Sequence, residues 1–129
     1  MPRQFSLAYL TTPGVDPLEQ IEIASQVGYD YVSLRTIPMG QAGEPQVHLE
    51  DDPQMFRQIR QALREREMKL FDIELLRIRE DLPTDYRAAF EKGAELGATQ
   101  VLTSVWTRDR GLAADRYGAF CEQAAQFGL

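Results

Sequence analysis

One five-residue pattern recurs three times along the chain, and its spacing limits the folds that the chain can adopt. Each copy has two small residues, a variable residue, an apolar residue and a glycine, and the copies lie at residues 24–28, 93–97 and 124–128. Small residues allow the end of a helix to lie close to a sheet, and the glycine permits the left-handed turn that ends a helix. An apolar segment begins about three residues after each of the first two copies, so the pattern predicts repeated helix-to-strand units.

Strand and helix candidates alternate along the whole sequence. Short apolar runs predict strands at residues 5–11, 31–36, 68–79 and 100–106. Apolar residues at helical spacing predict four helices, which begin after Asp16, after Asp52, near Tyr86 and after Gly111. Such alternation predicts an α/β fold of four βα units, with parallel strands joined by right-handed crossovers.

The repeat would continue with a fifth strand immediately after Leu129. We therefore expect residues 1–129 to be a single partial domain, from which the fifth strand and those beyond it are absent. Four parallel strands alone would leave unpaired edges and an incompletely covered face. We expect the missing neighbours to come from a C-terminal half or from a homo-oligomer.

The third strand candidate, residues 68–79, carries two acids where a core is expected. Strand side chains alternate between faces. Strict alternation predicts one face with Phe71, Ile73 and Leu75, and an opposite face with Asp72, Glu74 and Leu76. Because an unpaired buried carboxylate is costly, the two acids should face a cation, a ligand or a polar cavity.

Composition excludes several classes of function. The net charge of −6 disfavours nucleic-acid binding. The sequence has no apolar run long enough for a membrane helix and no secretory leader pattern. We therefore expect a cytoplasmic protein. His48 and Cys121 are the only histidine and cysteine, which excludes a zinc site of His and Cys ligands and an internal disulfide. A metal held by carboxylates would be Mg or Mn. Cys121 lies on a predicted inward stripe, which indicates plain packing.

Between the second strand and the second helix lies a Gly- and Pro-rich segment, residues 37–53, that is too long for a simple connection. Such loops often cover sites. His48 lies on this loop, where a solvent-exposed position is expected rather than a catalytic one.

Four segments resemble the sugar phosphate isomerase/epimerase family, which has the xylose-isomerase-like TIM-barrel fold. They are Phe-Ser-Leu-Ala-Tyr-Leu at 5–10, Gly-Tyr-Asp-Tyr-Val-Ser-Leu-Arg at 28–35, Phe-Asp-Ile-Glu-Leu at 71–75, and Gly-Ala-Glu-Leu-Gly-Ala at 93–98 leading into Val-Leu-Thr-Ser-Val-Trp at 101–106. The resemblance covers the N-terminal half of a (β/α)8 barrel. It implies isomerisation or epimerisation of a sugar, sugar phosphate or hydroxy-carbonyl compound, usually with a divalent metal. It also implies that later strands, outside these residues, supply most metal ligands and proton-transferring acids, so we assign no metal ligand here.

Sites in α/β folds form at the C-terminal ends of the strands. The polar or aromatic candidates there are Tyr9, Thr11, Arg35, Glu74, Arg77, Ser104 and Trp106. We predict Glu74 as the catalytic residue, in contact with a substrate hydroxyl or acting as general base. We predict as substrate-binding residues Tyr9, Arg35, Arg77, Ser104 and Trp106. Arg35 suits a carboxylate or phosphate, and Trp106 suits a wall against a sugar ring.

Each of these predictions has a structural alternative. Glu74 and Arg35 could form an ion pair with each other, Asp72 could be a structural partner of Arg35 or of a backbone amide, and Trp106 could be core. For the whole chain, the alternatives are a flavodoxin-like binding module without chemistry and an inactive truncated half-barrel. Nucleophile-elbow, phosphate-loop and dinucleotide-binding motifs do not occur.

Overall fold

The structure is a computed structural model that describes all residues from 1 to 129. Its elements in chain order are β1 (Ser6–Leu7), a 3₁₀ turn η1 (Tyr9–Thr11), α1 (Pro17–Val27), β2 (Tyr31–Arg35), α2 (Pro53–Glu65), β3 (Lys69–Ile78), α3 (Arg87–Glu95), β4 (Gln100–Val105) and α4 (Arg110–Ala125). Strands and helices alternate four times, as predicted. Asp16 and Asp52 cap α1 and α2, each followed by a proline at the first helical position.

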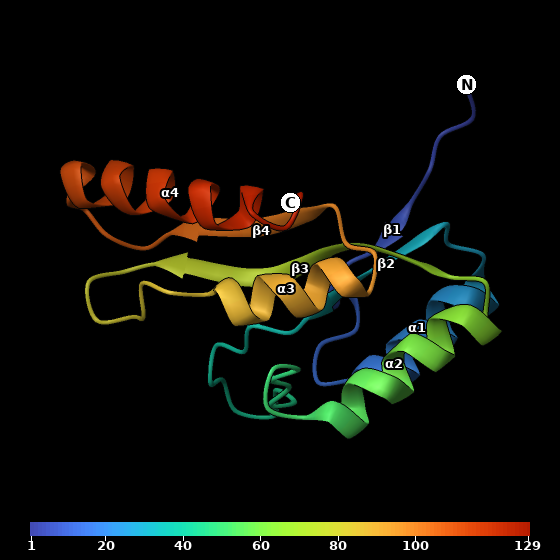
Figure 1. Ribbon diagram of the computed structural model, residues 1–129. Helices are drawn as coiled ribbons and strands as arrows, with labels where there is room; N and C mark the ends of the chain where they lie inside the picture. The colour runs from blue at the N-terminus through green and yellow to red at the C-terminus, as the bar shows by residue number, and fades with distance from the viewer.

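The four strands form one parallel sheet in the order β1-β2-β3-β4 (Figure 1). This confirms the predicted α/β fold of four βα units. A flavodoxin-like sheet has its first two strands exchanged, in the order 2-1-3-4-5, so the alternative of a flavodoxin-like module is wrong.

The first strand is shorter than predicted. Only Ser6 and Leu7 pair with β2, and the chain then turns away from the sheet at Ala8, whose carbonyl accepts a hydrogen bond from the Thr11 N–H. Tyr9 therefore lies on the turn directly after the strand rather than on the strand itself. This turn brings the Tyr9 side chain into the buried interior.

β3 does not keep strict alternation, because it bulges against both neighbours. Ser33 lies opposite two residues of β3, and the register to β4 shifts again between Ile73 and Leu76. Each extra residue moves the following side chains to the other face. The prediction that Leu76 shares a face with Glu74 is therefore wrong, since Leu76 is buried in the core beside Phe90.

All four helices cover one face of the sheet. Ile21 of α1, Ile59 of α2, Phe90 of α3 and Phe120 of α4 belong to a single buried cluster with the helix-facing strand residues. In Figure 1, α1 and α2 lie side by side, α3 runs along β3 and α4 along β4. The opposite face of the sheet has no helix.

The last helix and strand are less covered than predicted. Tyr117 and Cys121 are exposed, so the inward position predicted for Cys121 is wrong. Phe120 is the one fully buried residue of α4, its ring meets Tyr86 edge to face at 5.5 Å, and no element lies beyond this helix. On β4, which has no strand on its outer side, Leu102 is 48% and Val105 is 56% exposed.

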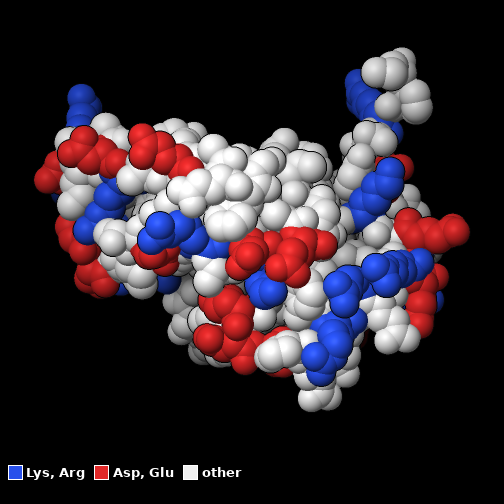
Figure 2. Space-filling model, viewed as in Figure 1, with Lys and Arg blue, Asp and Glu red and all other residues white.

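Charges on the visible surface are mixed. Figure 2 shows Lys and Arg side chains in a band over the region where Figure 1 places α2, next to groups of acidic side chains. Arg57, Arg60 and Arg64 of α2 are spaced by one helical turn and so share a face. None of the helices combines the length and the apolar character needed to cross a membrane.

Candidate functional site

The sheet face opposite the helices carries polar side chains. Ser33 and Arg35 alternate along β2 with Val32 and Leu34, which belong to the helix-side core. The Ser33 hydroxyl hydrogen-bonds the Ser6 hydroxyl at 2.9 Å, which links β1 and β2 on this face. In a barrel, this face would be the interior.

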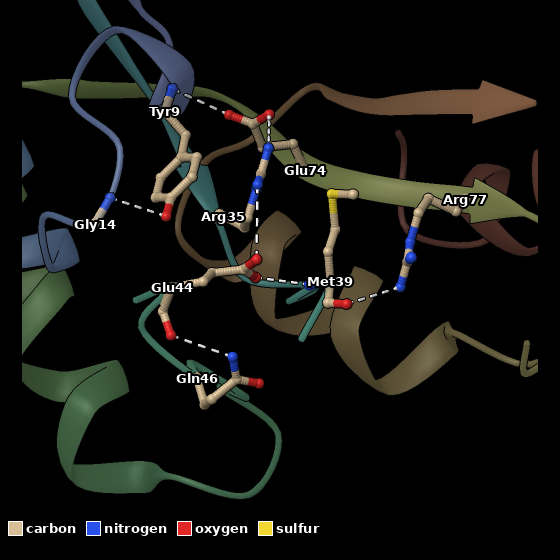
Figure 3. A network of polar contacts seen from close by, with 8 residues as sticks. All are labelled: Tyr9, Gly14, Arg35, Met39, Glu44, Gln46, Glu74 and Arg77. Atoms are coloured by element: carbon tan, nitrogen blue, oxygen red, sulfur yellow. Dashed lines mark hydrogen bonds and ion pairs between the residues drawn. The ribbon is translucent and has the colours of Figure 1, made fainter. Parts of the chain in front are cut away.

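Arg35, Glu44 and Glu74 form a buried ion cluster near the C-terminal ends of β2 and β3 (Figure 3). Arg35 Nη2 donates to Glu74 Oε2 at 3.3 Å, and Arg35 Nη1 lies 3.8 Å from Glu44 Oε2. The guanidinium lies 4.1 Å above the centre of the Tyr9 ring, and the Tyr9 N–H donates to Glu74 Oε1 at 3.1 Å. The structure thus brings together three predicted site residues, Tyr9, Arg35 and Glu74. Arg35 and Glu74 form the ion pair that was the structural alternative to their predicted roles in substrate binding and catalysis.

Glu44 is a member of this cluster that the sequence did not reveal. It comes from the long loop after β2, and its Oε1 accepts a 2.6 Å hydrogen bond from the Met39 N–H. An acid on a polar loop has no periodicity that would mark it as buried. The only signal in the sequence was the length of the loop, because loops of this length often cover a site.

The cluster has more negative than positive charge, because two carboxylates share one guanidinium. Arg35 is therefore already paired with two carboxylates, whose charge offsets its attraction for an anionic group of a substrate. Arg35 Nε and Nη1 and Glu44 Oε2 are buried without a hydrogen-bond partner. Glu74 is 3% exposed, so a ligand can reach its carboxylate only if neighbouring residues move.

Arg77, Ser104 and Trp106 form a second, more open group at the ends of β3 and β4. The Trp106 indole N–H donates to the Ser104 hydroxyl at 2.9 Å, and the Arg77 guanidinium lies 5.2 Å from the centre of the Trp106 ring. Trp106 is 45% exposed, so plain core packing does not describe it. Arg77 Nη2 also donates to the Met39 carbonyl at 3.3 Å, which connects this group through the loop to the ion cluster (Figure 3).

Asp72 is a half-buried acid on this face of the sheet that has no ion pair. Burial raises the pKa of its carboxyl to about 6, the Ser33 hydroxyl counteracts this, and the charge of Glu74 adds to the increase. Its Oδ1 is buried without a hydrogen-bond partner. Asp72 therefore does not pair with Arg35 as the structural alternative proposed, and it titrates close to neutral pH.

Replacing Asp72 with asparagine should stabilise the protein at pH 8 and have little effect at pH 4. The folded-state pKa of about 6 lies above the ordinary 3.8, so ionised Asp72 costs stability, and this cost appears as the pH rises from about 4 to 6. Allowing for solvent screening of a half-buried group, the gain at pH 8 should be about 1–2 kcal/mol. Urea unfolding at both pH values measures it, and an equal effect at pH 4 and pH 8 would contradict it.

Comparison with solved structures finds matches over essentially the whole chain. A xylose isomerase domain containing protein from Salmonella typhimurium LT2 superposes with a TM-score of 0.64 at 9% identity, over 98% of this chain and 47% of that one. A xylose isomerase-like TIM barrel/4-hydroxyphenylpyruvate dioxygenase fusion protein superposes with a TM-score of 0.66 at 22% identity, over 100% of this chain and 21% of that one. This chain has the fold of half a xylose isomerase-like TIM barrel. No family model and no curated protein matches the sequence.

The half-barrel therefore spans less than half the length of these two proteins, and identities this low show the fold alone. Active sites of TIM barrels lie at the C-terminal ends of the strands. Arg35, Glu74, Arg77 and Trp106 all lie at that end of this half-barrel, at the last residue of a strand or within a few residues of it.

The residues of this half-barrel do not fit a metal centre. No group of three or more His, Cys, Asp or Glu side chains lies close enough together to hold a metal ion. Glu74 and Glu44 are already bound to Arg35, and Asp72 stands alone. We therefore derive no chemical step through a metal from these residues.

Proposed function

We propose that this chain is half of a sugar phosphate isomerase/epimerase-like barrel that acts on a sugar or hydroxy-carbonyl compound by carboxylate-mediated proton transfer. The observation that carries the proposal is the arrangement of Arg77, Ser104 and Trp106 at the open ends of β3 and β4, on the same sheet edge as Glu74, which lies three residues before Arg77 on β3. The likeness in fold to xylose isomerase-like barrels supports it.

In this proposal Glu74 moves the proton. It removes a proton from the carbon next to the carbonyl, which leaves an enediolate. Isomerisation follows when Glu74 returns the proton to the neighbouring carbon and the hydroxyl proton moves to the former carbonyl oxygen. Epimerisation requires a second acid, supplied by the other half of the barrel, to protonate the same carbon from the opposite face. The hydrogen bonds from Tyr9 N–H and Arg35 fix the orientation of the carboxylate, and each of its oxygens keeps a lone pair for the substrate.

Two residues take roles different from those expected. The anionic group of the substrate is assigned to Arg77 rather than to Arg35, because Arg35 is paired with two glutamates. Arg35, held by Glu44 from the long loop and by Glu74, positions the Glu74 carboxylate instead. Trp106 provides an apolar wall and Ser104 holds its indole ring in place.

We also propose that a second copy of the chain completes the barrel. Four parallel strands with free outer edges on β1 and β4 are half of the eight that a TIM barrel requires. A two-fold axis along the barrel places β4 of each copy beside β1 of the other, so both edges are paired at once.

The experiment for catalysis is deuterium exchange at the carbon next to the carbonyl, followed by NMR in D2O. Ketose phosphates and phosphorylated hydroxy-carbonyl compounds are incubated with the protein, with and without Mg²⁺ or Mn²⁺. The Glu74→Gln variant should exchange at least about 100-fold more slowly, the usual scale for loss of a general base. The exposed Glu91→Gln, which makes the same change on α3, should match the wild type. Equal exchange by Glu74→Gln and the wild type would remove Glu74 from the mechanism.

One observation favours a second candidate, an inactive half-barrel. The ion cluster is closed, because each oxygen of Glu74 already accepts one hydrogen bond and its side chain is buried. A buried ion pair of this kind serves structure as well as catalysis. Absence of exchange with every compound of the panel would select this candidate.

A further inference from the structure

A cavity of about 440 Å³ lies at the N-terminal ends of the strands, which is the end of the sheet opposite the ion cluster. Its wall includes Tyr31 and Lys69, the first residues of β2 and β3, and Thr99, which directly precedes β4. Residues in the last turns of α2 and α3 complete the wall. None of the predicted site residues lines this cavity, so it is separate from the candidate site described above.

Three basic residues line this cavity, and all three are exposed, so a ligand can reach them. They are Arg60, Arg64 and Lys69, and none of them forms an ion pair within the chain. The wall contains one acid, Glu95, which is paired with Lys92 at 3.0 Å. The cavity therefore has an excess of positive charge, although the chain as a whole has a net charge of −6.

The fold itself uses only part of this positive charge. The C-terminal end of a helix carries a partial negative charge, which Arg64 offsets in the last turn of α2 and Lys92 in that of α3. Arg60 lies one turn before Arg64, where two like charges destabilise a helix. Its guanidinium lies 5.3 Å from the centre of the Phe56 ring, a contact that leaves its N–H donors free. Arg60 and Lys69 thus have no carboxylate partner, and a bound anion would offset their charge.

Much of the remaining wall is apolar or aromatic. Leu63, Met68 and Leu70 are buried members of the hydrophobic core. Tyr31 and Phe71 are half-buried, and their rings meet edge to face at 5.5 Å. Small-molecule sites combine such walls with a few charged or polar groups. An aromatic ring suits this wall, because aromatic groups pack favourably against one another edge to face or with an offset.

We propose that this cavity binds an aromatic anion, with its acidic group against Arg60 and Lys69 and its ring against Tyr31 and Phe71. Lys69 is paired in register with Tyr31 and lies two residues before Phe71, so the strand brings the cation and the aromatic wall together on one face. The unpaired positive charge selects against neutral and cationic molecules. The proposal does not depend on the proposed catalysis, because the cavity lies at the other end of the sheet from Glu74.

The test is titration of the protein with 1-naphthyl phosphate, followed by the shifts of amide signals in NMR spectra. We expect a dissociation constant on the order of 1 mM for a ligand of this size, with shifts at residues 60–64, 69–71 and 97–99. 1-Naphthol lacks the charge and inorganic phosphate lacks the ring, so each should bind at least about tenfold more weakly. Equal affinity for 1-naphthol, no binding of 1-naphthyl phosphate up to about 20 mM, or shifts confined to the surroundings of Arg77 and Trp106 would overturn the proposal.

Variants locate the binding within the molecule. Arg60→Gln and Lys69→Gln each remove one charge from the wall, and each should weaken binding about 3-fold, with about 10-fold for the double variant. Arg57→Gln removes the same charge from an exposed residue of α2 that does not line the cavity, and should change the affinity by less than about 1.5-fold. Amide spectra verify that each variant is folded. Unchanged affinity in the double variant, or an equal loss in Arg57→Gln and Arg60→Gln, would overturn the proposal.

Discussion

Replacing Arg35 with methionine should lower the free energy of unfolding by about 3–5 kcal/mol, as measured by urea denaturation at pH 7. The substitution keeps the length of the side chain but removes the only cation within reach of Glu44 and Glu74. Both carboxylates are almost fully buried, so each would be left as an uncompensated charge. The effect is large because the penalty comes from the two acids that remain, not from the contacts that are lost.

Combined variants separate this cause from simple loss of packing. Adding Glu44→Gln and Glu74→Gln to Arg35→Met should recover most of the lost stability, because no buried charge then remains. Arg57→Met on the exposed face of α2 is the matched control and should change stability by less than about 0.5 kcal/mol. A triple variant as unstable as Arg35→Met would show that the cluster matters through shape rather than charge.

The chain should sediment with about twice its 14.7 kDa mass, and Leu102→Lys should convert it to a monomer. Leu102 is 48% exposed on β4, and a second copy that completes the barrel would bury it beside β1 of the partner. A lysine there would place an unpaired charge in the barrel interior, so association should weaken at least about 100-fold. Sedimentation velocity over a range of concentrations measures both mass and affinity.

A charge control is needed, because the chain carries a net charge of −6 and one added lysine reduces self-repulsion. Gln58→Lys on α2 adds the same charge in the middle of the half-barrel, away from both sheet edges, and should leave the dimer intact. A wild type that stays monomeric at high concentration would exclude closure by a second copy, and dissociation by both lysine variants would indicate a nonspecific charge effect.

The candidate site was predictable in part. The positions of Tyr9, Arg35 and Glu74 near strand ends follow from the alternation of strands and helices, since parallel strands bring their C-terminal ends to one edge. The contact between Trp106 and Ser104 follows from their two-residue spacing at the end of β4, where the chain is still extended. The place of Glu44 in the ion cluster could not be predicted, because it depends on where an irregular loop folds back.

The sequence by itself determined the order of the elements and the parallel sheet. Repeated helix-to-strand units with short connections leave few other topologies, because crossovers between parallel strands are right-handed. Only the tertiary structure decided which face of the sheet each side chain of β3 beyond Asp72 points to. Bulges in β3 arise because it pairs with two neighbouring strands at once, and they leave no mark in the alternation of apolar and polar residues. The position of Arg35 at the site was likewise predictable from the sequence. Only the tertiary structure decided that its charge is already paired, because a second glutamate, Glu44, reaches it from a distant loop.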